Sequence, residues 1–325
     1  MRFVVYGAGA IGATIGAKLH LAGDDVVLIA RGRQLEALQH DGLLFQDPDG
    51  ERRLAINAVG SPAEATVSSD DVILLTVKTQ DSAAALEQLA AIGNPRLSVV
   101  CAQNGVENER LALRRFAAVY GMFVYLPAQN VEPGVVQCFA APTPGVLDVG
   151  GAPSGVDERG ETIAAALRSA GFASCTRADI MRWKYSKLLA NLANATQALF
   201  GPEAAGFDWQ QRARDEALEC YRAAGIAFAD DAEVAERIGS ASAARPVNGR
   251  SHAGGSSWQS LVRGSGSIES DYLNGEIVLL GRLHGVATPV NQALAETAGR
   301  MARRSEAAGS ADPAAFARAV EQLAR

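Results

Sequence analysis

The sequence lacks the features that mark several large classes of protein. Its 30 Lys and Arg residues face 36 Asp and Glu residues, which gives a formal net charge of −6, and no basic run is long enough to neutralise a track of phosphates. No stretch reaches the roughly 18 to 20 uninterrupted apolar residues of a membrane-spanning helix. We therefore expect neither nucleic acid nor a membrane as a partner.

Cysteine and histidine are scarce, with four residues of each. No two cysteines form a Cys-X-X-Cys pair, and the histidines show no spacing typical of metal ligands. These residues are Cys101, Cys138, Cys175, Cys220, His20, His40, His252 and His284. The sequence therefore predicts neither a disulfide framework nor a metal site.

The start of the chain superficially resembles a signal peptide, because Arg2 precedes a largely apolar stretch. That stretch contains four glycines, however, and ends at Lys18, so it is better interpreted as a strand, a glycine-rich turn and a helix. We therefore expect a cytoplasmic protein.

The length of 325 residues favours two domains, since single domains usually run to about 100 to 200 residues. In the first part, short β-branched runs alternate with helical patterns, which is typical of a parallel sheet covered on both faces. The predicted strands are residues 2–6, 25–30, 71–77 and 98–103, and the predicted helices are residues 11–21 and 82–92. Gly-, Pro- and Ala-rich stretches follow, and there we expect an antiparallel or irregular sheet.

After Cys175 the pattern becomes helical, and we expect no strand there. The predicted helices are residues 180–200, 209–224, 267–284 and 289–307, and a Ser-, Ala-, Gly- and Arg-rich loop covers residues 240–255. The expected fold is α/β, with a parallel-sheet domain at residues 1–178 and an all-helical domain at residues 179–325; the motifs below predict that the first binds a dinucleotide and that the second carries the substrate and catalytic residues.

The first turn carries the strongest motif. Gly7-Ala8-Gly9-Ala10-Ile11-Gly12 fits Gly-X-Gly-X-X-Gly between a strand and a helix, the arrangement that turns backbone N–H groups toward a pyrophosphate in a Rossmann fold. In this interpretation Gly7 permits the tight turn, Gly9 lets the backbone approach the phosphates, and Gly12 lets the helix pack on the strand. A purely structural glycine turn is the alternative.

The end of the second predicted strand indicates which nicotinamide cofactor is used. NAD sites usually place an acidic residue there for the ribose 2′-OH, whereas this chain has Arg31 and Arg33. A guanidinium can pair bidentately with a 2′-phosphate, so we predict NADP (NADPH), with Arg31 as the main contact. The alternative is that the arginines are simply solvated.

Two later strand ends, at Lys78 and at Asn104-Gly105, point to the same edge of the sheet, where ligands of open α/β sheets bind. Lys78 and Asn104 are therefore candidate contacts for the nicotinamide and its ribose. Asn-Gly is also a common turn former without a ligand role.

Three polar residues of the 180–200 helix form the candidate chemical site. Lys187, Asn191 and Asn194 have i, i+4, i+7 spacing, which places them on one face among leucines. Buried polar groups need a polar partner, and a keto acid is such a partner, although a polar contact between domains would also serve. Lys184 lies on nearly the same face and competes for the role of the lysine.

The whole chain resembles the ketopantoate reductase (2-dehydropantoate 2-reductase) family. The matching segments are Gly7 to Gly12, Lys78, Gln103-Asn104-Gly105, Lys187-Leu188-Leu189-Ala190-Asn191, Ser256-Ser257 and the run from Ile268 to Gly275. The resemblance implies NADPH-dependent reduction of 2-dehydropantoate to (R)-pantoate, a step toward pantothenate and coenzyme A.

The resemblance also implies roles for single residues. Lys187 matches the family's proton donor, Asn191 and Ser257 match substrate-binding positions, and Glu269 matches an acidic residue at the active site and the cofactor. The family often has a second asparagine eight residues after the lysine; this chain has Ala195 there, and Asn194 stands one place earlier.

The chemistry also follows from the residue types. Hydride transfer to a 2-keto carbon creates alkoxide charge, which an ammonium such as that of Lys187 can stabilise before it donates its proton. Glu269 would orient the amine, or would simply interact with a helix dipole, and Ser257 would bind the substrate carboxylate or be an ordinary loop serine. The partner is then a small 2-keto acid, with a homodimer as an open question.

Two alternatives stay open at this point. One is a related hydroxyacid or opine-type dehydrogenase, and the other is a non-catalytic NADP-binding sensor. The polar face with Lys187 favours an enzyme, because a sensor needs no proton donor.

Overall fold

The computed structural model describes residues 1–201, 207–239, 242–252, 254–264 and 266–325. Contacts divide the chain into two compact units: the first comprises Met1–Lys184 and Asp230–His252, and the second comprises Tyr185–Ala229 and Ala253–Arg325. The division thus falls a few residues after the predicted boundary at 178/179, and residues 230–252 join the first unit. Whether either unit is an independently folding domain stays a prediction.

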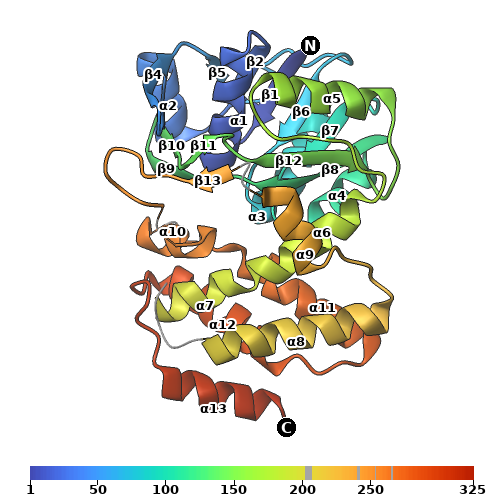
Figure 1. Ribbon diagram of the computed structural model, residues 1–325, viewed down its shortest axis with the longest axis vertical. Coiled ribbons are helices and arrows are strands. Elements are labelled where there is room, and N and C mark those ends of the chain that lie inside the picture. The colour runs from blue at the N-terminus through green and yellow to red at the C-terminus, as the bar shows by residue number, and fades with distance from the viewer. Residues whose placement is uncertain (202–206, 240–241, 253, 265) are drawn as a thin grey trace. The chain divides into compact units, whose positions relative to one another are not determined.

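The first unit is built on a seven-stranded sheet in the order β12-β8-β7-β6-β1-β2-β5 (Figure 1). The strands pair in parallel except β12, which runs antiparallel to β8. Their bounds are β1 Arg2–Tyr6, β2 Asp25–Ile29, β5 Asn57–Val59, β6 Val72–Leu75, β7 Ser98–Cys101, β8 Ala118–Tyr125 and β12 Val146–Gly151. The four predicted strands are all present, with ends that differ by up to two residues.

Helices cover both faces of this sheet. Successive strand residues point to opposite sides, so each face packs in its own core. Phe3 and Val5 pack in one core with α1 (Ala10–Leu21), α2 (Gly32–Asp41) and α5 (Glu158–Ser169). Val4 and Tyr6 pack in a second core with α3 (Thr79–Ala90) and α4 (Glu107–Leu113). The predicted α/β Rossmann architecture is confirmed.

Smaller sheets complete the first unit. One has the order β4-β3-β10-β9 and contains parallel and antiparallel pairs; its strands are β3 Leu43–Asp47, β4 Gly50–Leu54, β9 Ala128–Glu132 and β10 Val135–Cys138. The other pairs β11 (Ala140–Pro142) with β13 (Ser242–Ala244). The expectation of no strand after Cys175 is therefore wrong at β13. Its Ser-Ala-Ala sequence has no β-branched residue, and the strand depends on its tertiary pairing.

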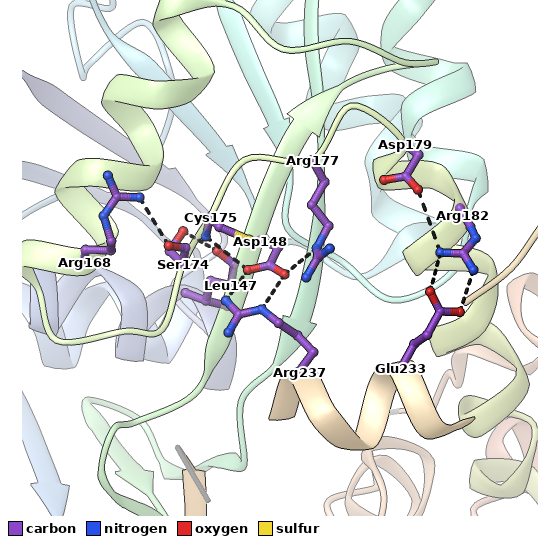
Figure 2. Close-up of polar contacts among 10 residues, drawn as sticks. All are labelled: Leu147, Asp148, Arg168, Ser174, Cys175, Arg177, Asp179, Arg182, Glu233 and Arg237. Carbon is purple, nitrogen blue, oxygen red and sulfur yellow. Dashed lines mark hydrogen bonds and ion pairs between the residues drawn. The ribbon is translucent and has the colours of Figure 1, made fainter. Parts of the chain in front are cut away.

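Residues 230–252 are tied to the first unit by ion pairs of α9 (Asp231–Ile238), as Figure 2 shows. Arg237 donates from Nε to Asp148 Oδ2 at 2.8 Å, and Arg177 donates to the same oxygen at 2.7 Å. Arg182 pairs with Glu233 through both guanidinium amino groups, at 3.0 and 2.5 Å. The side chain of Asp148 is fully buried, so it anchors α9 from within β12.

The second unit contains helices only among its described residues, which agrees with the predicted all-helical domain. After the C-terminal half of α6 (Ile180–Asn191) come α7 Ala193–Phe200, α8 Phe207–Ala224, α10 Ser256–Val262, the 3-10 helix η2 Glu269–Tyr272, α11 Asn274–His284, α12 Pro289–Arg304 and α13 Pro313–Leu323. No described helix is both long and apolar enough to cross a membrane.

Two predicted helices are interrupted in the structure. The 180–200 pattern divides at Leu192, whose carbonyl accepts a hydrogen bond from Asn274 Nδ2 at 3.5 Å. The 267–284 pattern divides into η2 and α11 at Leu273, whose backbone angles (φ −110°, ψ −82°) are not helical. The periodicity of apolar residues continues through both breaks, so it could not locate them.

Candidate functional site

The glycine turn between β1 and α1 has a separate steric reason for each of its glycines. Gly7 has φ +115°, and a Cβ there would lie 2.6 Å from the Val77 nitrogen. A Cβ on Gly12 would lie 2.3 Å from the Gly7 carbonyl oxygen, whereas one on Gly9 would meet nothing within 4 Å. Gly7 and Gly12 therefore permit the turn and the packing, while Gly9 leaves the backbone open to a ligand.

The N-terminus of α1 suits an anion. Gly9 is its N-cap, no side chain caps it, and no acidic residue lies in its first turn. The Ala8 N–H donates to the Ile29 carbonyl at 3.2 Å, so that group is already used within the protein. The N–H groups of Ala10 and Ile11 belong to the first turn, where a helix offers no internal acceptor. A pyrophosphate fits this positive end of the helix dipole.

Arg31 lies where the sequence predicts the contact with the 2′-phosphate. It is the N-cap of α2, directly after β2, and its side chain is exposed. Its Nη2 lies 3.5 Å from Oδ1 of Asp81, a residue of the first turn of α3. Arg33 is also exposed. The guanidinium of Arg31 is thus accessible to a phosphate, but it already has a carboxylate neighbour that the sequence analysis missed.

Gln34 supports the glycine turn and was also missed. Its Nε2 donates to the Ala8 carbonyl at 2.8 Å, and its Oε1 accepts from the Gly134 N–H at 3.0 Å. Nothing in the local sequence distinguishes this glutamine from a solvated residue, because both partners are distant along the chain.

Lys78 and Asn104 follow neighbouring parallel strands, since Leu75 of β6 pairs with Cys101 of β7. Both residues are partly exposed, and both emerge at the carboxyl edge of the sheet, as does the glycine turn. Gln103 links the two loops, because its Nε2 donates to the Val77 carbonyl at 2.9 Å. The first unit therefore brings together the predicted contacts of a dinucleotide: Gly7 to Gly12, Arg31, Lys78 and Asn104.

The two candidate lysines of α6 have different environments. Lys184 is 2% exposed, and its ammonium donates to Glu109 Oε1, to the Gln103 carbonyl at 3.1 Å and to the Cys101 carbonyl at 3.4 Å. Lys187 follows three residues later, and burial lowers its pKa to about 8. A general acid works best when its pKa lies near the operating pH, so Lys187 is the better candidate for proton transfer.

The second unit contains buried polar atoms that have no partner among the described residues. They include Asn191 Nδ2 and Ser257 Oγ, on residues that are 4% and 2% exposed. Unsatisfied buried groups are costly, and a polar ligand is one explanation for their presence. These two residues are the ones that match substrate-binding positions in the resemblance described above.

Asn194 faces α10, because its Nδ2 donates to Ser256 Oγ at 3.4 Å. A Cβ on Gly255 would lie 2.5 Å from Asn194 Oδ1, so glycine permits this close approach. Ala195 is 1% exposed and packs in the helical core. Glu269 opens η2 and is partly exposed.

Comparison with known proteins gives consistent matches over most of the chain. A family model described as "Ketopantoate reductase PanE/ApbA" matches residues 3–152, and one described as "Ketopantoate reductase PanE/ApbA C terminal" matches residues 179–302. A 2-dehydropantoate 2-reductase of Halobacterium salinarum is 30% identical over 318 residues, which cover 94% of this chain and 99% of that protein.

Two solved structures show the same fold. A PanE/ApbA family ketopantoate reductase from Ralstonia eutropha JMP134 has a TM-score of 0.77 at 25% identity and covers 94% of this chain and 100% of its own. D-mandelate dehydrogenase, solved with NADH and anilino(oxo)acetate, has a TM-score of 0.78 at 21% identity and covers 94% of this chain and 99% of its own. At that identity the second likeness concerns the fold alone.

Proposed function

Because the chain belongs to the ketopantoate reductase family, we propose that it catalyses the NADPH-dependent reduction of 2-dehydropantoate to (R)-pantoate. The family and the type of enzyme, an NADP-dependent oxidoreductase, are confirmed as the sequence predicted them. The observation that most supports the reaction is Lys187, whose pKa burial lowers to about 8, on the helix that also carries Asn191.

The residues of the first unit would hold the cofactor. The α1 N-terminus at Gly9 to Gly12 would bind the pyrophosphate, and Arg31 would bind the 2′-phosphate. Lys78 and Asn104 would contact the nicotinamide and its ribose from the carboxyl edge of the sheet. NADPH bound there supplies a hydride to the keto carbon.

Lys187 would supply the proton. Its ammonium would stabilise the negative charge that develops on the substrate oxygen and then donate a proton to that oxygen. Asn191 and Ser257 would bind the substrate through the buried atoms that have no partner among the described residues, and Asn194 would contribute from α7. Glu269 would orient the lysine.

A second candidate is a dehydrogenase for another 2-hydroxy acid. Two observations favour it: D-mandelate dehydrogenase shares the fold, and Ala195 stands where the family often has asparagine.

The deciding experiment is NADPH oxidation assayed with 2-dehydropantoate, phenylglyoxylate and a panel of branched 2-keto acids. A kcat/KM for 2-dehydropantoate at least tenfold above every other acid supports the proposal, whereas a preference for phenylglyoxylate favours the second candidate. Tight NADPH binding without turnover of any keto acid would indicate a sensor. The cytoplasmic location and the homodimer stay predictions.

A further inference from the structure

The ion pair of Lys184 and Glu109 is the most deeply buried pair of opposite charges described in the first unit. Lys184 is 2% exposed and Glu109 is 1% exposed. Burying two charges costs desolvation energy that their attraction often fails to recover, so such a pair contributes little to stability compared with apolar residues of similar volume. A role other than stability must therefore be considered.

The remaining contacts of Lys184 indicate what that role is. Its ammonium also donates to the carbonyls of Cys101 and Gln103, the residues that lead from the end of β7 to Asn104. Two acceptors from this segment, together with the Glu109 carboxylate on α4, fix the path of the segment at the carboxyl edge of the sheet.

A hydrogen-bond network continues from this segment to the loop that carries Lys78. Gln103 Nε2 donates to the Val77 carbonyl at 2.9 Å and to Ser82 Oγ at 2.8 Å. Ser82 Oγ donates to Asn108 Oδ1 at 2.7 Å, and Asn108 Nδ2 donates to Thr79 Oγ1 at 3.2 Å. The two loops are therefore linked through buried side chains, and neither can shift without breaking several bonds.

We propose that Lys184 and Glu109 are positioning residues, which hold the two loops so that Lys78 and Asn104 meet the nicotinamide half of the cofactor. This inference rests on the proposed function, because it assumes that NADPH binds at this edge of the sheet. The adenine half would be bound elsewhere, by Arg31 and the glycine turn, neither of which forms a hydrogen bond with Lys184 or Glu109.

The test measures binding directly, without a keto acid. A single substitution would leave one charge buried and unpaired, which is strongly destabilising, so the main variant is Lys184→Met/Glu109→Met, which removes both charges. We expect its Kd for NADPH to rise roughly tenfold, because the donors to the Cys101 and Gln103 carbonyls are lost. Its Kd for adenosine 2′,5′-bisphosphate, which lacks the nicotinamide half, should stay within about twofold of the unmodified value.

Ser82→Ala is a second variant that removes only one hydroxyl from the network. It should fold readily and weaken NADPH binding in the same direction by about threefold. Arg2→Gln is the matched control, because it breaks the ion pair with Asp71 (Nε–Oδ1 2.9 Å) at the opposite end of the strands. It should lower stability without changing either Kd.

The outcomes separate the inference from the proposed function. Unchanged NADPH binding in both the double variant and Ser82→Ala would overturn the positioning role, as would an equal loss of affinity for both ligands. Failure of the unmodified protein to bind NADPH would overturn the proposed function together with this inference. Reduction of a keto acid other than 2-dehydropantoate would change the proposed function alone.

Discussion

Lys187 follows Lys184 by three residues on α6, and the two amines lie in different environments. The ammonium of Lys184 is satisfied by a carboxylate and two carbonyls, whereas burial lowers the pKa of Lys187 to about 8. One helix thus carries a structural lysine and a candidate acid, which the spacing of the sequence alone could not distinguish.

Substitution of Lys187 tests the candidate acid. We expect Lys187→Ala to lower kcat by about 100-fold or more, because the proton donor and the stabilising charge are lost together. The Kd for NADPH should stay within about twofold. A near-normal kcat would show that another group donates the proton.

The pKa of Lys187 gives the pH dependence. The lysine must carry its proton to donate it, so kcat for reduction should be constant below about pH 8 and fall by tenfold per unit above it. The reverse oxidation needs the neutral amine and should rise over the same range. The comparison of kcat between pH 6 and 10 in both directions provides the test, and a flat profile for reduction would contradict it.

Arg31 should determine the preference for NADPH. A charged contact with the 2′-phosphate contributes about 1.5 to 3 kcal/mol, so Arg31→Ala should raise the KM for NADPH roughly tenfold or more and leave the KM for NADH nearly unchanged. Arg33→Ala is the matched control, with a smaller effect. Equal kcat/KM for NADH and NADPH in the unmodified protein would rule the assignment out.

Asp81 adds a prediction that only the structure could supply. Its carboxylate lies 3.5 Å from the Arg31 guanidinium and would repel a 2′-phosphate bound there. We therefore expect Asp81→Asn to tighten NADPH binding by about twofold to fivefold, since exposed charges interact weakly, and less so at high salt. Weaker NADPH binding in this variant would mean that the ion pair orients Arg31 for the phosphate.

The sequence predicted what depends on local patterns. The alternation of β-branched runs with helical patterns indicated the parallel sheet, and the glycine spacing indicated the turn that Gly7 and Gly12 form. The absence of an acidic residue after the second strand pointed to Arg31. It did not reveal Gln34 or the Lys184–Glu109 pair, because their partners lie 26 to 100 residues away along the chain. Such contacts are determined by tertiary packing, which produces no regular spacing of residues in the sequence.

The anchoring of α9 by Asp148 leads to the last prediction. The Asp148 side chain is fully buried and accepts hydrogen bonds from Arg237 and Arg177 (Figure 2). Burial alone would raise the pKa of Asp148, but the two arginines outweigh it and hold the pKa below its ordinary value. This stabilisation is present above the unfolded pKa of about 4 and is lost as the pH falls through the lower folded pKa.

Asp148→Asn should therefore lower the free energy of unfolding by about 3 kcal/mol at pH 7, because it leaves two arginines without their shared carboxylate. Glu233→Gln is the matched control on the same helix: its pair with Arg182 is partly exposed and screened by solvent, so the loss should be much smaller than that of Asp148→Asn. Urea unfolding of the three proteins at pH 7 and pH 3 provides the measurement.

The difference in the free energy of unfolding between Asp148→Asn and the unmodified protein should be smaller at pH 3, because there the carboxylate takes up a proton in the unfolded state. A difference in the free energy of unfolding that is as large at pH 3 as at pH 7 would mean that Asp148 stabilises the protein by its shape and hydrogen bonds, and not by its charge.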